Sequence, residues 1–362
     1  MWPESSEQPQ PLRTGLTTGT CATACCVAAA HLLLGQQSNS QASVTLPKGQ
    51  IVELDIQDLE QSHQFAHAAT IKDAGDDPDV THGAKVWVRL GLKASAGVSF
   101  HAATGVGTVT RVGLLLDVGE PAINPVPRQM IQINLQSTAQ KYDYQGGFDV
   151  HIGIENGEQL AQKTMNGRLG IQGGLSVLGT SGIVRPFSCS AWIASIHQGL
   201  DVAYSNGHTH VAASTGNTSE AFVQQRYQMQ DMQLIEMGDF AGAVLKHLKK
   251  SPIAKLTLCA GFGKLTKLAN GHLDLHSSRS SIDLGQLQAI AAKLGADKLL
   301  QSQISKANTS IQALQLCQQA NIDLAGAVCL AAQQQAQKIV PHSVNVEIIA
   351  VDRQGQLIGQ AI

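Results

Sequence analysis

The stretch THVAASTGNTSEAFVQQRY (residues 209–227) contains the pattern that decides the fold. Thr209–Ala213 is typical of a short buried strand, and Ser219–Tyr227 has helical character, with a loop rich in Gly, Ser and Thr between them. The same order of strand, loop and helix recurs over residues 234–249 and 255–268. Such alternation predicts a mainly parallel sheet with helices on both faces.

The alternation begins near residue 147 and continues to the end of the chain. Its remaining predicted elements are strands at 148–154, 175–178 and 344–351 and helices at 157–163, 188–199, 282–294 and 309–336. A chain of 362 residues favours two domains. We therefore predict an α/β plus α+β fold, in which residues 147–362 form a Rossmann-like, mainly parallel α/β domain.

Residues 1–146 have a different pattern, which predicts an α+β domain. An Ala-rich helical stretch ends at Gly35, a β-hairpin is expected over 44–56, and strands are expected over 84–92 and 106–116. The stretch Gly119–Arg128 contains three prolines, so we expect a stiff loop there instead of a helix or a central strand. Its Glu120, Asn124 and Arg128 are candidate ligand contacts, although a rigid linker explains the prolines equally well.

Composition indicates which partners and which cellular compartment to expect. The chain has 25 Lys and Arg against 27 Asp and Glu, so we expect neither a nucleic-acid partner nor a membrane partner. Residues Met1–Pro11 lack the apolar core of a signal peptide, and we expect no segment long enough to span a bilayer. The seven cysteines are an odd number and look reduced. These features predict a cytoplasmic protein.

The junction Arg13–Ala22 is a candidate anion site, because Thr17, Thr18 and Thr20 precede a long helix. A helix N-terminus offers unpaired N–H donors and the positive end of a dipole, and Arg13 adds a guanidinium. The alternative is an ordinary N-cap made by one of the threonines.

Small-residue loops at predicted strand ends are the candidate cofactor sites, because open α/β sheets bind ligands at the carboxyl ends of their strands. The residues are Gly173, Gly174, Thr180, Ser181 and Gly182 in the segment 170–182, Gly216 and Asn217 after strand 209–213, and Glu236 and Asp239 after strand 234–237. An acid at such a position commonly holds ribose hydroxyls. Tight turns and helix caps explain the same residues.

The segment 270–279 is the densest polar cluster, with His272, Asp274 and His276 on one face if it is extended. It is a candidate for binding a metal, a carboxylate or a macrocycle, and the alternative is a solvated surface hairpin. No Ser-His-Asp elbow, zinc-protease helix or Cys-x-x-Cys pair is present, so we assign no catalytic residue and no protein metal site.

Taken together, these segments resemble the cobalt-precorrin-5B C1-methyltransferase family of anaerobic cobalamin biosynthesis. The resemblance covers nearly the whole chain after the first dozen residues. It rests on Arg13–Ala22, Gly105–Val109, Gly119–Arg128, Gly170–Pro186, Gly238–Gly242 and the pair His276-Ser277. The chain departs from the expected pattern at Gly167, where proline is expected after Asn166, and at Leu275, where threonine is expected.

The resemblance implies methyl transfer from S-adenosylmethionine to C1 of a cobalt-containing tetrapyrrole, which gives cobalt-precorrin-6A. We hypothesise that the glycine-rich strand ends bind this cofactor, because of their position in the α/β pattern, with Glu236 or Asp239 as a ribose partner. Such a substrate bears many carboxylates, which favour Arg residues and helix N-termini, so we assign it to Arg13, Thr17, Thr18, Thr20, Arg128, His276, Ser277 and Arg279. Whether the protein forms a homo-oligomer is left open.

Two alternatives use the same architecture. A nicotinamide-dependent oxidoreductase needs a Gly-x-Gly-x-x-Gly turn followed by a ribose-binding acid, which the sequence does not contain at a first strand-to-helix turn. A non-enzymatic corrinoid carrier would bind the tetrapyrrole without consuming S-adenosylmethionine.

Overall fold

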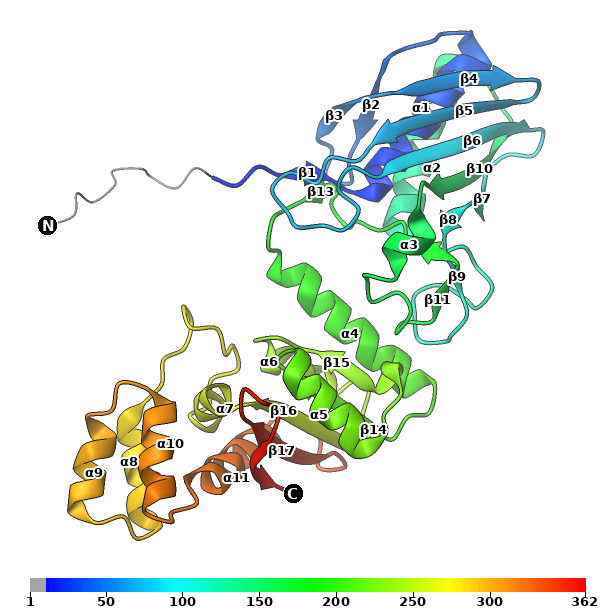
Figure 1. Cartoon of the computed structure of the whole chain (residues 1–362). Helices are drawn as coiled ribbons and strands as arrows, with labels where there is room; N and C mark the ends of the chain where they lie inside the picture. The colour runs from blue at the N-terminus through cyan, green and yellow to red at the C-terminus, as the bar shows by residue number, and fades with distance from the viewer. Residues whose placement is uncertain (1–10) are drawn as a thin grey trace, which may run out of the picture. The chain divides into compact units, whose positions relative to one another are not determined.

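The computed structural model describes residues 11–362, which divide into two compact units, unit 1 ending at Ser188 and unit 2 beginning at Cys189 (Figure 1). The predicted boundary at 146/147 is therefore wrong. Residues 147–154 do form a strand, but it pairs along its whole length with a strand of the first unit. The first ten residues, which belong to the stretch without a signal-peptide pattern, lie outside the described residues.

Unit 1 is built on a five-stranded sheet of order β4-β5-β6-β10-β7, in which only β7 and β10 pair in parallel. Its strands are β4 (Asp58–Ser62), β5 (Phe65–Ile71), β6 (Lys85–Lys93), β7 (Val98–Ala102) and β10 (Gly147–Ile154). One face is apolar and buried, as Val86, Val88 and Leu90 of β6 illustrate, and the alternate residues form the outer face. The predicted strand 84–92 is thus confirmed.

Two helices pack on the buried face, α1 (Thr18–Gly35) and α2 (Pro125–Lys141). The first thirteen residues of α1 are all buried, which requires small side chains and explains its run of Ala and Cys. By length and composition α1 would also be able to cross a membrane, contrary to the expectation from the sequence, but 72% of it is buried inside the protein. All seven cysteines are free thiols, as predicted.

The helix α2 corrects a second prediction, because the Pro-rich stretch is a loop only as far as Asn124. Pro125 and Pro127 lie in the first helical turn, where a missing N–H removes no intrahelical hydrogen bond. Proline there starts a helix instead of preventing one.

Short elements complete unit 1. They are the hairpin strands β2 (Gln41–Thr45) and β3 (Ile51–Asp55), the two-residue strands β1 (Gly15–Leu16), β8 (Gly105–Val106), β9 (Thr108–Val109), β11 (Ile171–Gln172), β12 (Gly174–Leu175) and β13 (Ile183–Val184), and the helix α3 (Gly157–Ala161). The predicted hairpin is confirmed. The predicted strand 106–116 is wrong beyond Val109, since the chain bends there.

Unit 2 contains a sheet of order β15-β14-β16-β17-β18, and every neighbouring pair except β17 with β18 is parallel. The strands are β14 (His210–Ser214), β15 (Leu234–Glu236), β16 (Lys255–Gly261), β17 (Asn345–Val351) and β18 (Leu357–Ala361). The mixed α/β character and the parallel order predicted from the strand–helix alternation are confirmed for this unit.

Helices cover both faces of this sheet. The helices of unit 2 are α4 (Cys189–Ser205), α5 (Asn217–Tyr227), α6 (Ala241–His247), α7 (Phe262–Ala269), α8 (Leu284–Lys293), α9 (Lys298–Ser305), α10 (Ser310–Gln319) and α11 (Leu324–Gln337), with a 3-10 turn at Asp231–Gln233. Of these, α8, α9 and α10 pack on α7, on α11 and on one another. The helix α5 packs on one face, and α4, α6, α7 and α11 pack on the other. The predicted helix 309–336 is two helices, which separate at residues 320–323.

Candidate functional site

The carboxyl ends of β14 and β16 form the switch point of the sheet in unit 2. After β14 the chain passes through α5 to β15 on one side, and after β16 it passes through α7 to β17 on the other side. The two strands end next to each other, with Ser214 in register with Cys259. In open α/β sheets, ligands bind at the carboxyl edge at such a point.

Ser214, the last residue of β14, has an unsatisfied hydroxyl. Its side chain is 99% buried, and among residues 11–362 its Oγ is the one buried side-chain N or O atom without a hydrogen-bond partner. A buried hydroxyl without a partner costs free energy, so its presence at a strand end favours a polar ligand there. The next helix begins at Asn217, and there is open space where a side chain would be at Gly216.

The two predicted ribose-binding acids differ in their environment. Glu236 ends β15 and is the register partner of Ser214, and no ion pair to its carboxylate is found within the part of the chain that the structure describes. Asp239 instead forms an ion pair with Lys264 of α7. Glu236 is therefore the acid that is available to a ligand.

Trp192 of α4 also lies at this edge, and its sequence context gave no sign of it. Its Nε1 donates a hydrogen bond to the Glu236 carbonyl at 3.1 Å. A side chain at Gly238 would place Cβ 3.3 Å from the Trp192 indole, so Gly238 allows the ring to lie against the backbone. With 44% of its surface exposed, the indole offers an apolar face beside Glu236.

The polar segment 270–280 is held at the same edge of unit 2 by Leu275. This side chain is fully buried, and its backbone N–H donates to the Asp239 carbonyl at 2.9 Å. The Leu275 carbonyl accepts a hydrogen bond from Lys267 Nζ at 2.9 Å. Burial, together with the neighbouring charge of Lys264, lowers the pKa of Lys267. The buried Leu275 side chain and the hydrogen bonds of its backbone thus anchor this segment to unit 2.

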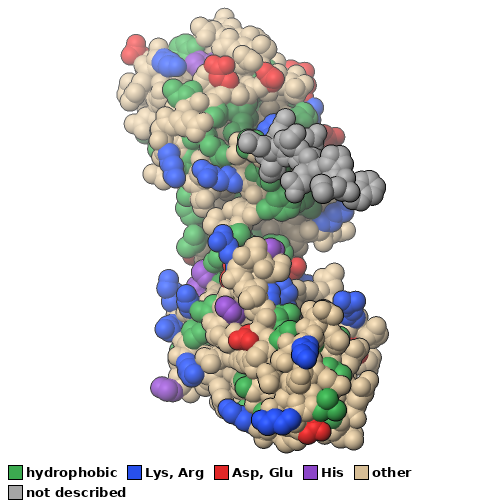
Figure 2. All heavy atoms as spheres, turned by 90° about the vertical axis from the view of Figure 1, so that its left-hand side faces the viewer, with side chains coloured by type: hydrophobic (Ala, Val, Ile, Leu, Met, Phe, Trp, Pro, Cys, Tyr) green, Lys and Arg blue, Asp and Glu red, His purple; other side chains and the backbone are tan. Residues whose placement is uncertain are grey.

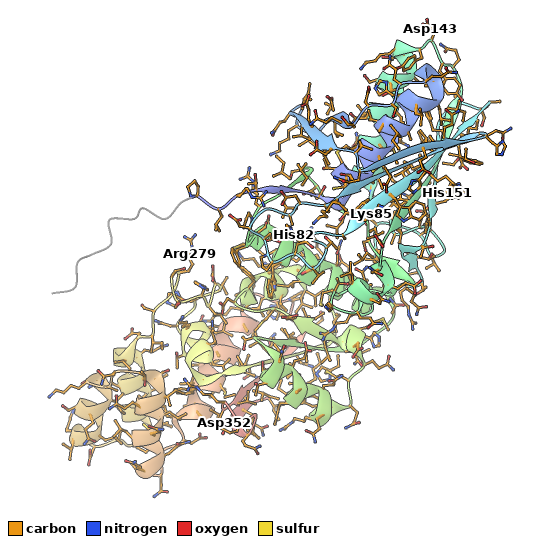
Figure 3. The ribbon with its side chains drawn as sticks, turned by 45° about the horizontal axis from the view of Figure 1, so that its top comes forward. His82, Lys85, Asp143, His151, Arg279 and Asp352 are labelled. Carbon is orange, nitrogen blue, oxygen red and sulfur yellow. The ribbon has the colours of Figure 1, made fainter. Side chains whose placement is uncertain are left out.

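The residues after this anchor are exposed. His276 Nδ1 lies 2.7 Å from Ser278 Oγ, and Ser277 and Arg279 face solvent. Figure 3 shows Arg279 on the loop between α7 and α8. The structure therefore brings the predicted substrate residue His276 into the same loop cluster as the predicted cofactor residue Asp239.

The N-terminus of α1 is occupied by its own chain. Thr17 Oγ1 accepts the Thr20 N–H at 3.3 Å, the Gly19 N–H donates to the Leu178 carbonyl at 3.2 Å, and Thr20 Oγ1 donates to the Gly182 carbonyl at 2.7 Å. Thr17, Thr18 and Thr20 are all buried. Thr17 is therefore an N-cap of α1, as the alternative interpretation expects. The substrate role of these threonines stays a prediction.

The two predicted arginines of unit 1 already have partners. Arg13 forms a bidentate ion pair with Asp73, with a second contact of 3.0 Å, and this lowers the pKa of Asp73 to about 2. Arg128 Nε donates to the Ile123 carbonyl at 2.7 Å, and its NH2 group lies 3.1 Å from Glu120. On the face shown in Figure 2, basic side chains are scattered instead of gathered into one patch.

Five predicted cofactor residues, Gly173, Gly174, Thr180, Ser181 and Gly182, belong to unit 1, and Gly216, Asn217, Glu236 and Asp239 belong to unit 2. A Cβ at Gly174 would lie 2.3 Å from the backbone of Gly105, and one at Gly179 would lie 2.4 Å from Thr17. These glycines therefore allow segments of unit 1 to lie close to one another. Their contact with a cofactor stays a prediction.

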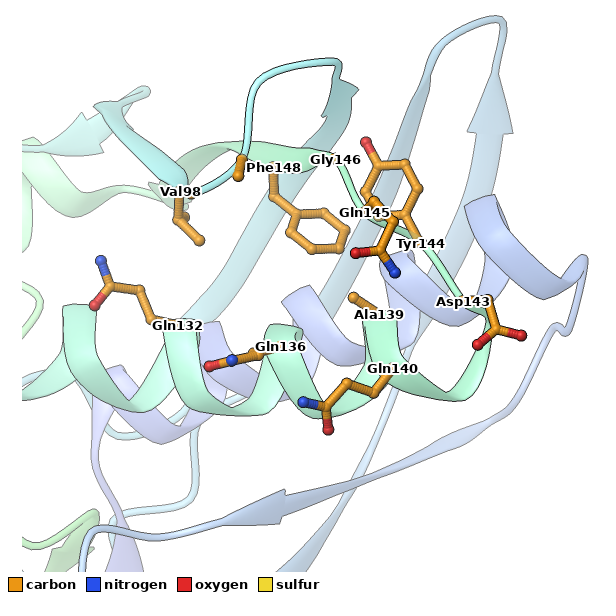
Figure 4. Close-up of a pocket in the computed structure, with 12 residues that line it drawn as sticks. Val98, Gln132, Gln136, Ala139, Gln140, Asp143, Tyr144, Gln145, Gly146 and Phe148 are labelled. Carbon is orange, nitrogen blue, oxygen red and sulfur yellow. The ribbon is translucent and has the colours of Figure 1, made fainter.

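A pocket of about 580 Å³ lies elsewhere in unit 1, between α2 and the strands β7 and β10. Figure 4 shows Gln132, Gln136 and Gln140 of α2 across from Phe148 and Tyr144. Among residues 11–362, no Lys, Arg or His lines it. An amide-lined pocket does not neutralise carboxylates, so we do not place a polyanionic substrate there.

Comparison with known families decides the identity of the chain. The CbiD family model matches residues 5–186, and the model described as CbiD, C-terminal domain matches residues 274–362. The chain belongs to the CbiD family. This CbiD protein is also 58% identical to a protein of Marinomonas sp. (strain MWYL1), with 100% of the chain and 97% of the relative covered.

Two further relatives are similar over their full lengths. The identity is 59% to a protein of Pseudomonas putida KT2440 and 60% to one of Burkholderia cenocepacia HI2424, with at least 98% of every chain covered. All three relatives are named cobalt-precorrin-5B C(1)-methyltransferase. A crystal structure of the cobalamin biosynthesis protein CbiD from Archaeoglobus fulgidus is 27% identical, with a TM-score of 0.40, 74% of this chain and 83% of that chain covered.

Proposed function

We propose that this CbiD protein transfers a methyl group from S-adenosylmethionine to C1 of cobalt-precorrin-5B, which gives cobalt-precorrin-6A. The observation that carries the proposal is the 58–60% identity, over essentially the whole chain, to proteins named for this reaction. It supports neither the oxidoreductase nor the carrier alternative. As the sequence suggests, we place the reaction in the cytoplasm.

We propose further that unit 2 is a Rossmann-like cofactor domain. The residues at its switch point fit S-adenosylmethionine, because Ser214 has an unsatisfied buried hydroxyl and Glu236 is an available acid beside it. Glu236 would hold the ribose hydroxyls, and the start of α5 at Gly216 and Asn217 would receive the carboxylate of the methionine moiety. When bound, the cofactor supplies an electrophilic methyl group on sulfur.

The substrate carries many carboxylates, and exposed cationic groups bind these well. Arg279, His276 and Ser277 stand on a loop that is anchored beside Asp239, so we assign carboxylate contacts to them first. Arg13 and Arg128 remain in the proposal as guanidinium donors that are already oriented by Asp73 and Glu120.

The chain needs no nucleophile of its own for this reaction. Bound S-adenosylmethionine would supply the methyl electrophile, the electron-rich substrate carbon would be the nucleophile, and S-adenosylhomocysteine would be the leaving group. The residues named here bind and orient, and holding two reactants in line supplies up to about 7–11 kcal/mol of the barrier in the best intramolecular cases.

The test is an anaerobic incubation of the full chain with cobalt-precorrin-5B and methyl-labelled S-adenosylmethionine. We expect label on the macrocycle and an equal amount of S-adenosylhomocysteine. Binding of the tetrapyrrole without consumption of S-adenosylmethionine would instead identify a carrier.

A further inference from the structure

The outer face of the sheet in unit 1 carries two histidines and an aspartate in one cluster, and none of them takes part in the site described above. His101 lies on β7, and Asp149 and His151 lie on β10. Because β7 and β10 are parallel with His101 in register with His151, the two imidazoles leave the sheet side by side. Asp149 is two residues before His151, so it shares their face.

The side chains are arranged around a common point. His101 Nε2 lies 2.7 Å from one oxygen of Asp149, and His151 Nε2 lies 3.2 Å from the other. The two rings stack at 4.5 Å with an angle of 19° between their planes. Each of the three residues contributes one potential ligand atom, and these three atoms all lie within 4.8 Å of one another.

We propose that His101, Asp149 and His151 bind a divalent transition-metal ion of the Zn²⁺ type. Two imidazole nitrogens and a carboxylate oxygen form a donor set that suits zinc and leaves a fourth position for water. To reach nitrogen–zinc distances of about 2.0–2.1 Å, the two rings would turn from the carboxylate toward a shared ion. With 46% of its side chain exposed, His101 leaves the cluster open to solvent.

The surrounding residues are compatible with a cation. The β6 neighbour of His151 is Arg89, and its guanidinium lies over the Phe65 ring at 4.9 Å, on the side of β5. Figure 3 labels His151 on this sheet. Such an ion is separate from the cobalt of the substrate.

The site would join an edge strand to the rest of the sheet. The strand β7 has five residues and pairs within this sheet only with β10. A metal ion ligated from both strands adds a cross-strand link, and its binding to the folded state alone stabilises that state. We therefore expect zinc to raise the unfolding temperature of the protein.

The experiment is a calorimetric titration of the full chain, without a polyhistidine tag and freed of metal by chelation, with Zn²⁺. We expect one ion per chain, at least tenfold weaker binding in His101→Gln and in His151→Gln, and unchanged binding in His67→Gln. His67 is the matched control, because it lies on the same sheet face but on β5. Circular dichroism establishes that each variant is folded.

Asp149→Asn provides the second readout, because it keeps the size of the side chain and removes the charge. We expect weaker zinc binding in this variant and loss of the zinc-dependent rise in unfolding temperature. Titration with Co²⁺ adds a visible absorption band whose intensity reports the coordination number of the ion. Stoichiometry and affinity that are the same in wild type and all three cluster variants, or no binding to the wild type, would overturn the proposal.

Discussion

Ser214 and Glu236 are register partners at the carboxyl ends of the adjacent parallel strands β14 and β15. One contributes a buried hydroxyl without a partner and the other an available carboxylate. This pair is the basis of the proposed cofactor site, and the first prediction concerns it.

Replacing Glu236 by Gln removes the negative charge and one of the two acceptor oxygens that we assign to the ribose hydroxyls. We expect the dissociation constant for S-adenosylmethionine, measured by calorimetry, to rise by about tenfold or more, which corresponds to about 1.4 kcal/mol. Asp239→Asn is the control, because it breaks the ion pair with Lys264 and leaves Glu236 in place. Equal affinity in wild type and Glu236→Gln would contradict the assignment.

The exposed loop after Leu275 gives a second prediction. In Arg279→Ala we expect weaker binding of the tetrapyrrole with unchanged S-adenosylmethionine affinity, because Arg279 is assigned to substrate carboxylates alone. The same change at Arg353, on the turn before β18, serves as a control for loss of surface charge. The measurement is a fluorescence or absorbance titration with the substrate, and equal substrate affinity in Arg279→Ala and wild type would count against the contact.

The junction at the start of α1 is predicted to matter for stability. Thr20→Val removes the hydroxyl that donates to the Gly182 carbonyl, which keeps its hydrogen bond from the Thr17 N–H at 3.0 Å, so we expect a cost of about 1 kcal/mol. Thr18→Val is the control, since Thr18 lies in the same turn of α1, is 4% exposed, and takes no part in the contact with Gly182. Urea unfolding measures both, and equal losses would show that the Thr20 hydrogen bond contributes nothing.

Two glycines with similar backbone angles test the packing of the short strands. Gly105 has φ +83° and a Cβ there would lie 1.9 Å from the Ile154 carbonyl oxygen, whereas Gly119 has φ +93° and open space. We expect Gly119→Ala to cost about 1–2 kcal/mol from backbone strain alone. Gly105→Ala adds a clash and is expected to cost about 3 kcal/mol or more. Similar unfolding midpoints for the two variants would contradict this packing.

A buried acid in unit 2 gives a prediction about pH. Glu347 is 98% buried and accepts hydrogen bonds from Thr257 at 2.6 Å, Tyr227 at 2.8 Å and Lys255 at 2.9 Å. Burial alone would raise the pKa of Glu347, but these three donors outweigh it and hold the pKa below its ordinary value. Because the folded-state pKa is the lower one, the stabilisation is complete above the unfolded pKa and is lost as the pH falls through the folded pKa.

Glu347→Gln is therefore expected to lower the free energy of unfolding by about 3 kcal/mol at neutral pH. The difference from wild type should shrink as the pH falls through the lowered folded-state pKa of Glu347. Glu60→Gln, an exposed acid on β4, is expected to change little at any pH. A difference for Glu347→Gln that is constant down to the acid transition would contradict the network.

Sequence patterns were most informative where a local rule decides the structure. The helix ending at Gly35 and the strand–loop–helix repeats of residues 209–268 follow from periodicity and small-residue loops, and all are present. Prolines misled us at 119–128, because the same residue that breaks a helix interior is favoured in its first turn. Here the position within the element decided the outcome.

What the sequence did not reveal depends on partners distant in the chain. The strand 147–154 looks like any parallel-sheet strand, and only its pairing with β6 and β7 places it in unit 1. The missing partner of Ser214 and the ion pair of Asp239 likewise depend on residues from other elements. Sequence alone gave the two acids equal weight, and the contact with Lys264 separates them.

The most direct test of the central claim is a single anaerobic turnover with ¹³C-methyl S-adenosylmethionine and cobalt-precorrin-5B, analysed by NMR of the extracted macrocycle. We predict a new ¹³C methyl signal at C1 for the wild type, and about tenfold slower formation for Glu236→Gln at subsaturating cofactor. No labelled methyl group at C1 with the wild-type protein would contradict the function, and equal rates for the two proteins would contradict the site.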